Sequence, residues 1–323
     1  MSYCVGVIGC GRWGMKHIST LLEMKKQGSI NQVFACDINP KRLESLPQSV
    51  DGKFSSWREM CKQISFDLVT IATPNPTHYR LGREIMSMGT HVLIEKPTAT
   101  SSSEVAKLSQ IAAQYSSNLH SGYLLRYHPV VLEAEKKIRR GDIGVVKSIR
   151  YVKYSSRNRS AGSNIVSGLA SHAFDTVPYL ANLRLNPLVL SAVAFSHDEL
   201  APLDKASKGN IRLQYKDVQR ASNIEVEVTV GWGLDSQFSV TIEGTKNLLY
   251  LDLQGDGSLH VDSLNHPPLP LLASNNKSPL ESQYQNILSN SELAQSTKES
   301  LLTTAQLIDS AASWMKNWYT EYA

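Results

Sequence analysis

The sequence predicts an α/β protein in which a doubly wound parallel sheet is followed by an α+β domain on an open, largely antiparallel sheet. Up to about residue 121, short apolar strands alternate with helical stretches, which is typical of a parallel sheet with crossover helices. Beyond that point, longer segments alternate apolar and polar residues, as strands with one exposed face do. We therefore expect two domains, 1–121 and 122–323.

Composition restricts the classes of protein to consider. The chain has 323 residues, 41% of them hydrophobic, which is enough for two cores. Its net charge of +4 is too small and too dispersed to predict a nucleic-acid or membrane partner. No apolar run approaches the roughly 18 residues that span a bilayer. Because the N-terminus leads directly into a strand, we expect no signal peptide and a cytoplasmic protein.

The four cysteines indicate a reducing compartment. Cys4, Cys10, Cys36 and Cys61 all lie in the first fifth of the chain, and no two have the spacing of metal ligands. We interpret them as reduced, mostly buried thiols, and we expect no metal site.

A glycine-rich motif lies directly between the first strand and the first helix. Residues 9–14 read Gly-Cys-Gly-Arg-Trp-Gly, which is G-x-G-x-x-G in the context that dinucleotide binding requires. Gly9 permits a tight turn, Gly11 lets the backbone approach a pyrophosphate, and Gly14 lets the helix pack on the strand. The phosphates would lie at the helix N-terminus beside Arg12 and Trp13. The motif predicts a Rossmann-type site.

The second strand, 32–36, ends at Asp37, about twenty residues beyond the last glycine. An acidic residue there hydrogen-bonds the adenosine ribose and repels a 2′-phosphate. Lys41 and Arg42 follow closely, so the sequence favours NAD and leaves NADP as the alternative. Asp37 as an ordinary turn or cap residue is the competing interpretation.

A lysine ends the fifth strand. Val92, Leu93 and Ile94 form a short buried strand, which stops at Glu95-Lys96-Pro97 because proline lacks the N–H that would continue a ladder. Ligands of open α/β sheets bind outside the carboxyl ends of the strands, so Lys96 is a candidate for contact with one. An ordinary surface lysine is the simpler alternative. Other elements expected in this half are strands at 67–73 and 119–123, a helix that begins near Thr77, and helices that begin with capping boxes at Ser56 and Ser101.

The second half contains the predicted open sheet. A helix is expected over 130–140, and a loop at 265–279 leads to C-terminal helices. The expected strands are 146–154, 188–195, 211–215, 224–231, 238–243 and 248–253. The exposed sheet face needs a cover, and a second copy of the chain would supply one. We therefore expect a homo-dimer or homo-tetramer.

Together these segments resemble the glucose-fructose oxidoreductase / inositol dehydrogenase (Gfo/Idh/MocA) family along the whole chain. The resemblance rests on the glycine motif, on residues 72–78 (Ala-Thr-Pro-Asn-Pro-Thr-His), on Glu95-Lys96-Pro97 and on residues 122–129. It implies an NAD(P)-dependent oxidoreductase that transfers a hydride to or from a hydroxyl or ketone of a small-molecule substrate: a sugar, cyclitol or sugar nucleotide.

The resemblance also implies roles for residues of the first domain. Lys96 would lie beside the nicotinamide, bind the reacting oxygen and help to move its proton. Thr73, Asn75, His78 and Glu95 match positions that line the nicotinamide half of the cofactor. For His78, packing at a helix start is the alternative.

In the second domain the resemblance implies a catalytic histidine and reveals one departure. His172 matches the acid/base histidine, and its ordinary pKa near 6.5 suits that role. The family's aspartate, one helical turn earlier, is replaced by Gly168. Asp175 either orients His172 or is a packing residue.

Further candidates for substrate contact come from the segments around this helix. Arg157 and Arg159 lie in a polar loop and could bind a phosphate or carboxylate in bidentate fashion, unless the loop is only solvated. Arg126 and Tyr154 are additional candidates, Tyr154 as a substitute proton donor.

Two other functions are compatible with the sequence. One is a catalytically silent dinucleotide-binding regulator, which Gly168 makes conceivable. The other is an enzyme that uses bound NAD transiently for a net elimination or glycoside cleavage. The sequence does not predict the individual substrate, the direction of the reaction, or dimer against tetramer.

Overall fold

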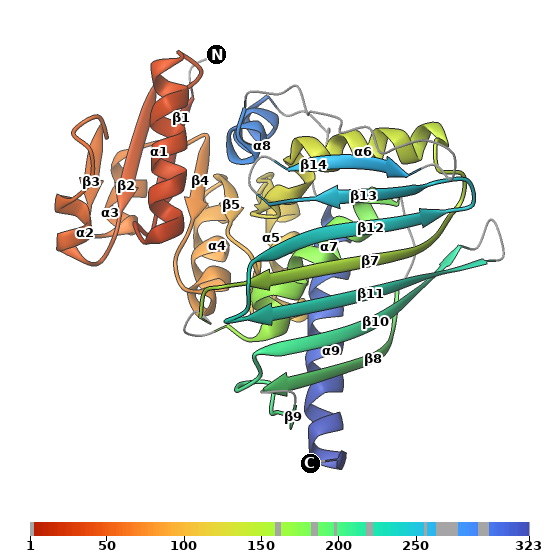
Figure 1. The fold of residues 1–323 in the computed structure, drawn as a ribbon. Helices are drawn as coiled ribbons and strands as arrows, with labels where there is room; N and C mark the ends of the chain where they lie inside the picture. Colours follow the sequence, from red (N-terminus) through yellow and green to blue (C-terminus); the bar gives the residue numbers. More distant parts are fainter. Residues whose placement is uncertain are drawn as a thin grey trace. The chain divides into compact units, whose positions relative to one another are not determined.

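The structure is a computed structural model (Figure 1) that describes residues 3–158, 163–181, 187–196, 199–217, 222–254, 257–262, 277–289 and 297–322. The chain divides into two compact units. The first comprises Met1–Leu124 and Lys277–Leu302, and the second comprises Leu125–Asn276 and Thr303–Ala323.

A parallel sheet with the strand order β3-β2-β1-β4-β5-β6 forms the centre of the first unit. All of its strand pairings are parallel. The strands are β1 (Cys4–Ile8), β2 (Gln32–Cys36), β3 (Gly52–Phe54), β4 (Leu68–Ile71), β5 (His91–Ile94) and β6 (Leu119–Ser121). The order reverses between β1 and β4, and the carboxyl ends of strands at such a point form the ligand crevice of open α/β sheets. The predicted doubly wound sheet is confirmed.

Helices connect these strands as the sequence predicts, apart from the short helix at Pro40–Glu44, which the sequence did not predict. They are α1 (Arg12–Lys26), α2 (Pro40–Glu44), α3 (Trp57–Gln63), α4 (His78–Met86) and α5 (Ser102–Gln114), with a 3-10 turn at Asn75–Thr77. The hydroxyl oxygens of Ser56 and Ser101 accept hydrogen bonds from the backbone N–H groups of Glu59 and Glu104, so both predicted N-caps form.

One helix of the first unit comes from far along the chain. The sequence pattern places everything beyond residue 121 in the second domain, whereas α8 (Pro279–Leu288) packs with the first unit. Its apolar residues Leu280, Tyr284 and Ile287 join the core that β1 and α1 form. The Gln283 side-chain amide also donates to the carbonyl of Ser121, at 2.9 Å. Burial of this apolar face fixes the helix on the first unit.

The second unit is built on a mixed sheet with the order β14-β13-β12-β7-β11-β10-β8-β9 in its described residues. Its strands are β7 (Val146–Ser155), β8 (Leu188–Ser196), β9 (Glu199–Leu200), β10 (Lys208–Asp217), β11 (Ser222–Trp232), β12 (Gln237–Gly244), β13 (Leu248–Asp252) and β14 (Ser258–Asp262). The pairing of β7 with β11 is parallel, and the other pairings are antiparallel. The prediction of a largely antiparallel sheet is confirmed. The sequence did not predict β9 and β14.

Helices cover one face of this sheet (Figure 1). They are α6 (Pro129–Arg140), α7 (Ser171–Leu180) and α9 (Lys298–Tyr322); a 3-10 turn at Leu124–Tyr127 precedes α6, and a π-turn at Val166–Ala170 leads into α7. Buried side chains of the strands, among them Ile149, Val228 and Ile242, form the core beneath the helices together with Met315 of α9. Most of the predicted loop at 265–279 lies outside the described residues.

The stability of the first unit should depend on the protonation of His120, which lies on β6. Burial lowers the pKa of His120 to about 4, and the nearby His91 adds to this shift. In an unfolded chain the pKa is about 6.5. Between these values the unfolded chain binds more protons than the folded one, so the free energy of unfolding falls as the pH drops from about 6.5 towards 4.

A His120→Asn variant should therefore lose less stability than the wild type between about pH 7 and about pH 5. Denaturant unfolding at both pH values measures the difference. A His260→Asn variant, changed in the second unit, controls for the loss of one imidazole. If the free energy of unfolding depends on pH equally in the wild type and in His120→Asn, His120 is not the group that causes the dependence.

Candidate functional site

The glycine turn at the carboxyl end of β1 is shaped by steric constraints that differ among its glycines. Gly9 has φ +95°, and a Cβ there would lie 2.7 Å from the carbonyl oxygen of Ala72. A Cβ on Gly14 would lie 1.7 Å from the carbonyl oxygen of Gly9, so α1 packs against the turn with no space for a side chain. Gly11 has φ −72°, and a Cβ there would meet nothing closer than Arg42 Nη1, at 3.9 Å. The space over Gly11 is therefore open.

This open turn suits a dinucleotide pyrophosphate. In the described structure, Gly11 is the N-cap residue of α1 and supplies no side-chain cap, and the first turn of the helix has no acidic residue. Its first N–H groups and the positive end of its dipole are therefore available to an anion. Arg12, on the first turn, is exposed and adds a positive charge. Trp13 is half-buried beside it.

Asp37 connects the end of β2 to the glycine turn. Its carboxylate oxygens accept hydrogen bonds from the backbone N–H groups of Cys10, at 2.7 Å, and Asn39, at 2.8 Å. Arg42 Nη1 lies 3.3 Å from Asp37 Oδ2, and only 3% of the Asp37 side chain is exposed. This geometry matches the competing interpretation of Asp37 as a turn residue. A ribose contact, and the preference for NAD that follows from it, stays a prediction.

The residues after β4 form a second part of the same edge. His78 is fully buried, with Nδ1 2.8 Å from the carbonyl oxygen of Pro97 and Nε2 2.8 Å from that of Thr73. It thus ties the segment after β4 to the segment after β5, which agrees with a packing role. Thr73 and Asn75 are only partly buried. They remain candidates for cofactor contact.

A chain of buried hydrogen bonds surrounds Glu95. Its Oε1 lies 3.0 Å from His17 Nε2, and its Oε2 accepts the backbone N–H of Lys96 at 3.0 Å. His17 Nδ1 lies 2.7 Å from the hydroxyl of Tyr284, which in turn lies 2.8 Å from Thr70 Oγ1. The chain thus links β5, α1, α8 and β4.

These contacts correct the expectation that Glu95 lines the cofactor. Its carboxylate points inward and is 7% exposed, and it fills space that a Cβ on Gly122 would enter at 3.0 Å. Glu95 instead holds the backbone of Lys96 in place. Sequence reasoning missed this role of His17, whose polar side chain on an apolar helix face was the one available signal, since buried polar groups are hydrogen-bonded. Nothing local to Tyr284 indicated its contact with His17.

The amine of Lys96 lies at the carboxyl end of β5 in an environment that disfavours its charge. Burial lowers the pKa of Lys96; the carboxylate of Glu95 opposes the shift and the guanidinium of Arg12 adds to it. Arg12 belongs to the glycine turn, so Lys96 and the turn are electrostatically coupled. An amine with a lowered pKa exchanges protons more readily near neutral pH.

His172 lies in the first turn of α7, directly after the π-turn, and is 8% exposed. Gly168 lies within the π-turn. A Cβ there would lie 2.5 Å from Cζ2 of Trp232, so the indole ring takes the space that a side chain at this position would need. Sequence reasoning noted the missing carboxylate but not the ring that replaces it.

Arg126 and Asp175 bind each other. Arg126 Nε lies 2.9 Å from Asp175 Oδ2, and Arg126 Nη2 lies 2.7 Å from Oδ1, which is bidentate geometry. The side chains are 6% and 0% exposed. The expectation that they contact substrate is therefore corrected: the pair joins the start of the second unit to α7.

The remaining substrate candidates lie at the end of β7. Tyr154 packs beside Gly231, whereas the next residue of β11, Trp232, points to the helix-covered face. Since side chains alternate along a strand, Tyr154 points to the open face, away from the helix of His172. This orientation corrects the expectation that Tyr154 is a substitute proton donor. Arg157 is exposed in the turn after β7, and Arg159 lies outside the described residues.

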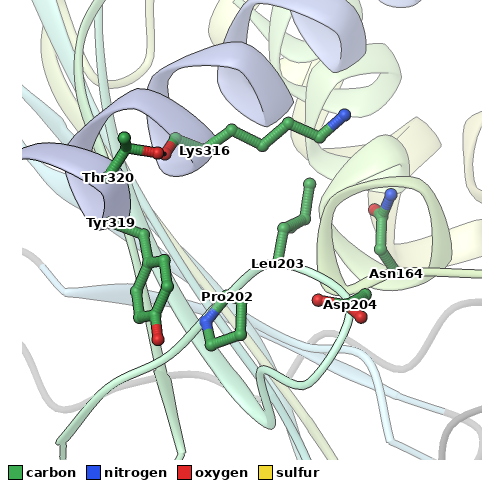
Figure 2. Close-up of a pocket in the computed structure, with 7 residues that line it drawn as sticks. All are labelled: Asn164, Pro202, Leu203, Asp204, Lys316, Tyr319 and Thr320. Carbon is green, nitrogen blue, oxygen red and sulfur yellow. Dashed lines mark hydrogen bonds between the residues drawn. The ribbon is translucent and has the colours of Figure 1, made fainter. Parts of the chain in front are cut away.

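Figure 2 shows a cavity of about 510 Å³ in the second unit. It lies beside the C-terminal part of α9, which contributes Lys316 and Tyr319; on the other side are Asn164 and the segment 202–204. It contains none of the site residues that the sequence predicts.

Metal and thiol chemistry find no support in the described part of the chain. No group of three or more His, Cys, Asp or Glu residues there is placed to hold a metal ion. The four cysteines are free, and burial raises the pKa of Cys10 and Cys36 to about 12, which makes both thiols unreactive near neutral pH. None of the described helices combines the length and apolarity needed to cross a bilayer.

Fold and site together define a protein of the Rossmann dinucleotide-binding class. Residues 4–123 match the family model described as "Oxidoreductase family, NAD-binding Rossmann fold" (GFO_IDH_MocA). This part of the chain is therefore similar to the Gfo/Idh/MocA family.

The chain is also similar to individual curated proteins. The rhizopine catabolism protein MocA of Rhizobium meliloti is 26% identical over 54% of this chain and 56% of its own length. A scyllo-inositol 2-dehydrogenase (NADP(+)) of Bacillus subtilis is 28% identical over 66% of this chain and 62% of its own. Three of the curated relatives are matched over only 56%, 48% and 50% of their length.

Among solved structures, a UDP-N-acetylglucosamine 3-dehydrogenase of Acidithiobacillus ferrooxidans superposes with a TM-score of 0.81. The two sequences are 17% identical, and the superposition covers 99% of each chain. At this identity the likeness shows a shared fold.

The different steric constraints on Gly11 and Gly14 predict different effects of an alanine substitution at the two positions. Gly11→Ala should keep the stability of the wild type within about 0.5 kcal/mol, because its backbone is relaxed and its surroundings are open. It should weaken NADH and NADPH binding at least tenfold, because a methyl group then lies where the pyrophosphate approaches. Calorimetric titration and thermal unfolding measure both effects. Gly14→Ala, the matched variant, should lose folding, and full cofactor affinity in Gly11→Ala would contradict the assignment.

The hydrogen-bond chain predicts the effect of removing one hydroxyl group. Tyr284→Phe leaves the buried groups of His17 and Thr70 without the oxygen that joins them, which should lower the free energy of unfolding by about 1–3 kcal/mol. Tyr322→Phe is the control, since Tyr322 is 59% exposed. Denaturant unfolding compares the variants, and equal stability would show that the hydroxyl group has no structural role.

Proposed function

We propose that this protein is an NAD(P)-dependent oxidoreductase that transfers a hydride between nicotinamide and a hydroxyl or ketone carbon. The substrate class we propose is a sugar, cyclitol or sugar nucleotide. The observation that carries the proposal is the position of Lys96: a partly buried amine with a lowered pKa, at the carboxyl end of β5 in the same unit as the open turn at Gly11.

The residues of the chain fit a bound dinucleotide. The turn at Gly11 admits the pyrophosphate, and the first N–H groups of α1 bind it. Beside Asp37, Ile38 is 91% exposed and offers an apolar surface for the adenine ring. The bound cofactor supplies a hydride donor or acceptor.

Lys96 and His172 then manage the charge and the proton of the reacting oxygen. In the oxidative direction the C–H carbon loses a hydride, and the hydroxyl group loses a proton. Lys96 stabilises the developing alkoxide by its positive charge, and the imidazole of His172 takes the proton. In the reductive direction His172 returns the proton. The function requires both side chains to meet at the same substrate oxygen.

Both nicotinamide cofactors are compatible with this site. The side chain of Arg42 is 53% exposed and offers a cation to a 2′-phosphate, while the NAD preference rests on Asp37. One relative is named as an NADP(+) enzyme, and we propose NAD with NADP as the alternative.

We also propose that a second copy of the chain covers the open face of the second sheet, as homo-dimer or homo-tetramer. Leu188, Leu190 and Tyr250 are exposed large apolar residues on strands of this sheet. Their burial would stabilise an assembly.

Replacing Lys96 tests the function. Lys96→Ala should reduce turnover by about a hundredfold to a thousandfold or more, the usual cost of losing one group that stabilises the oxyanion. Binding of NADH and NADPH should change little. The assay uses myo-inositol, D-glucose and UDP-N-acetylglucosamine, with NAD⁺ and NADP⁺, and follows both reduced cofactor and product. Lys107→Ala, an exposed change on α5, is the control.

The same assay separates the alternatives. Turnover in Lys96→Ala equal to that of the wild type would defeat the mechanism. Cofactor binding without turnover of any substrate would favour a silent regulator. Product without net change in reduced cofactor would indicate transient use of the nicotinamide in elimination or glycoside cleavage.

A further inference from the structure

Close to His172 in the chain, the second unit presents an aromatic ring at the position where the family resemblance implies an aspartate side chain. Gly168 is four residues before His172, so the two positions lie on the same side of the helix. A Cβ on Gly168 would meet Trp232 Cζ2 at 2.5 Å and Cη2 at 2.8 Å. With the indole ring in this place, position 168 has room for glycine but not for a residue with a Cβ atom.

The indole ring projects from a strand end that is fixed by backbone contacts. Trp232 is the last residue of β11, where it pairs with Ser155 of β7. The backbone N–H of Trp232 donates to the carbonyl oxygen of Ser207, at 2.7 Å. Its ring is only partly buried against the core, so part of the indole surface remains available for contact. The sheet thus fixes the backbone from which the ring projects.

The helix itself is irregular at the point of contact. Residues Val166–Ala170 form a π-turn, and Gly168 lies at its centre. Such π-turns are rare and frequently occur at functional sites. The irregularity, the glycine and the ring thus coincide one turn before the histidine that we assign to proton transfer.

From this juxtaposition we propose that Trp232 is a specificity-determining residue of the substrate site. The inference rests on the proposed function, because it places the substrate at His172. Indole carbon atoms offer no hydrogen-bond acceptor, so a hydroxyl group directed at them would lose its partner on binding. A flat or C–H-lined ring face instead gains contact area. The substrate class is therefore a sugar or cyclitol ring that lacks the hydroxyl group on one of the carbons next to the reacting one.

This proposal predicts a change of specificity with paired variants. Gly168→Asp alone should unfold at lower temperature, because its Cβ collides with the indole ring. The double variant Gly168→Asp/Trp232→Ala should recover stability, because removal of the ring frees that space. It should also gain a carboxylate that accepts a hydrogen bond from a substrate hydroxyl group. Trp232→Phe keeps an aromatic face and should retain the preference of the wild type.

The probes are two matched pairs, cyclohexane-1,2-diol with cyclohexanol and D-glucose with 2-deoxy-D-glucose, assayed with NAD⁺ and NADP⁺. For the wild type, kcat/KM should be at least about tenfold higher for the deoxygenated member of a pair. The double variant should invert this ratio. A ratio that is the same in wild type, Trp232→Ala and the double variant, with turnover intact, would overturn this inference alone. Absence of turnover with every probe while cofactor binds would overturn the proposed function as well.

Discussion

The position of Lys96 depends on a carboxylate that never reaches the surface. Glu95 accepts the backbone N–H of Lys96 and is itself held by His17, which is held by Tyr284. A buried carboxylate is tolerated only where hydrogen bonds replace its water, so each partner in this chain is needed by the next. The end of β5 is thereby fixed by side chains from two helices.

The edge of the parallel sheet around this carboxylate is organised by close backbone contacts. Gly9 and Gly14 have no space for side chains, and His78 links the segments after β4 and β5 through two carbonyl oxygens. Gly11 differs from both, because the packing of the protein itself leaves space for a side chain at this position. Rigid surroundings around one open position are what a preorganised binding site needs.

The features that the sequence revealed are those that local pattern determines. The glycine turn, the short strand before Lys96, the serine caps and the alternating strands of the second half each follow from the order of neighbouring residues. The parallel pairing of β7 with β11 and the return of α8 do not, because both join segments far apart in the chain.

The same limit applies to side chains at the site. Arg126 was a reasonable candidate for substrate contact until Asp175, 49 residues away, proved to be its partner. Gly168 was visible as a departure from the family pattern, but the reason for it is a ring from the end of β11. Charge and residue type suggest which groups are able to act; only the tertiary contacts show which are already engaged.

The return of α8 to the first unit has a consequence for how the molecule is made. A ribosome delivers the chain from its N-terminus, and domains generally fold as units in that order. Here the parallel sheet emerges early, but the phenol that anchors His17 is Tyr284, which is synthesised after every strand of the second sheet. The first unit to appear is therefore still incomplete after the described strands of the second sheet have been made, and a nascent chain that stops before α8 leaves Glu95 with an unanchored histidine as its partner.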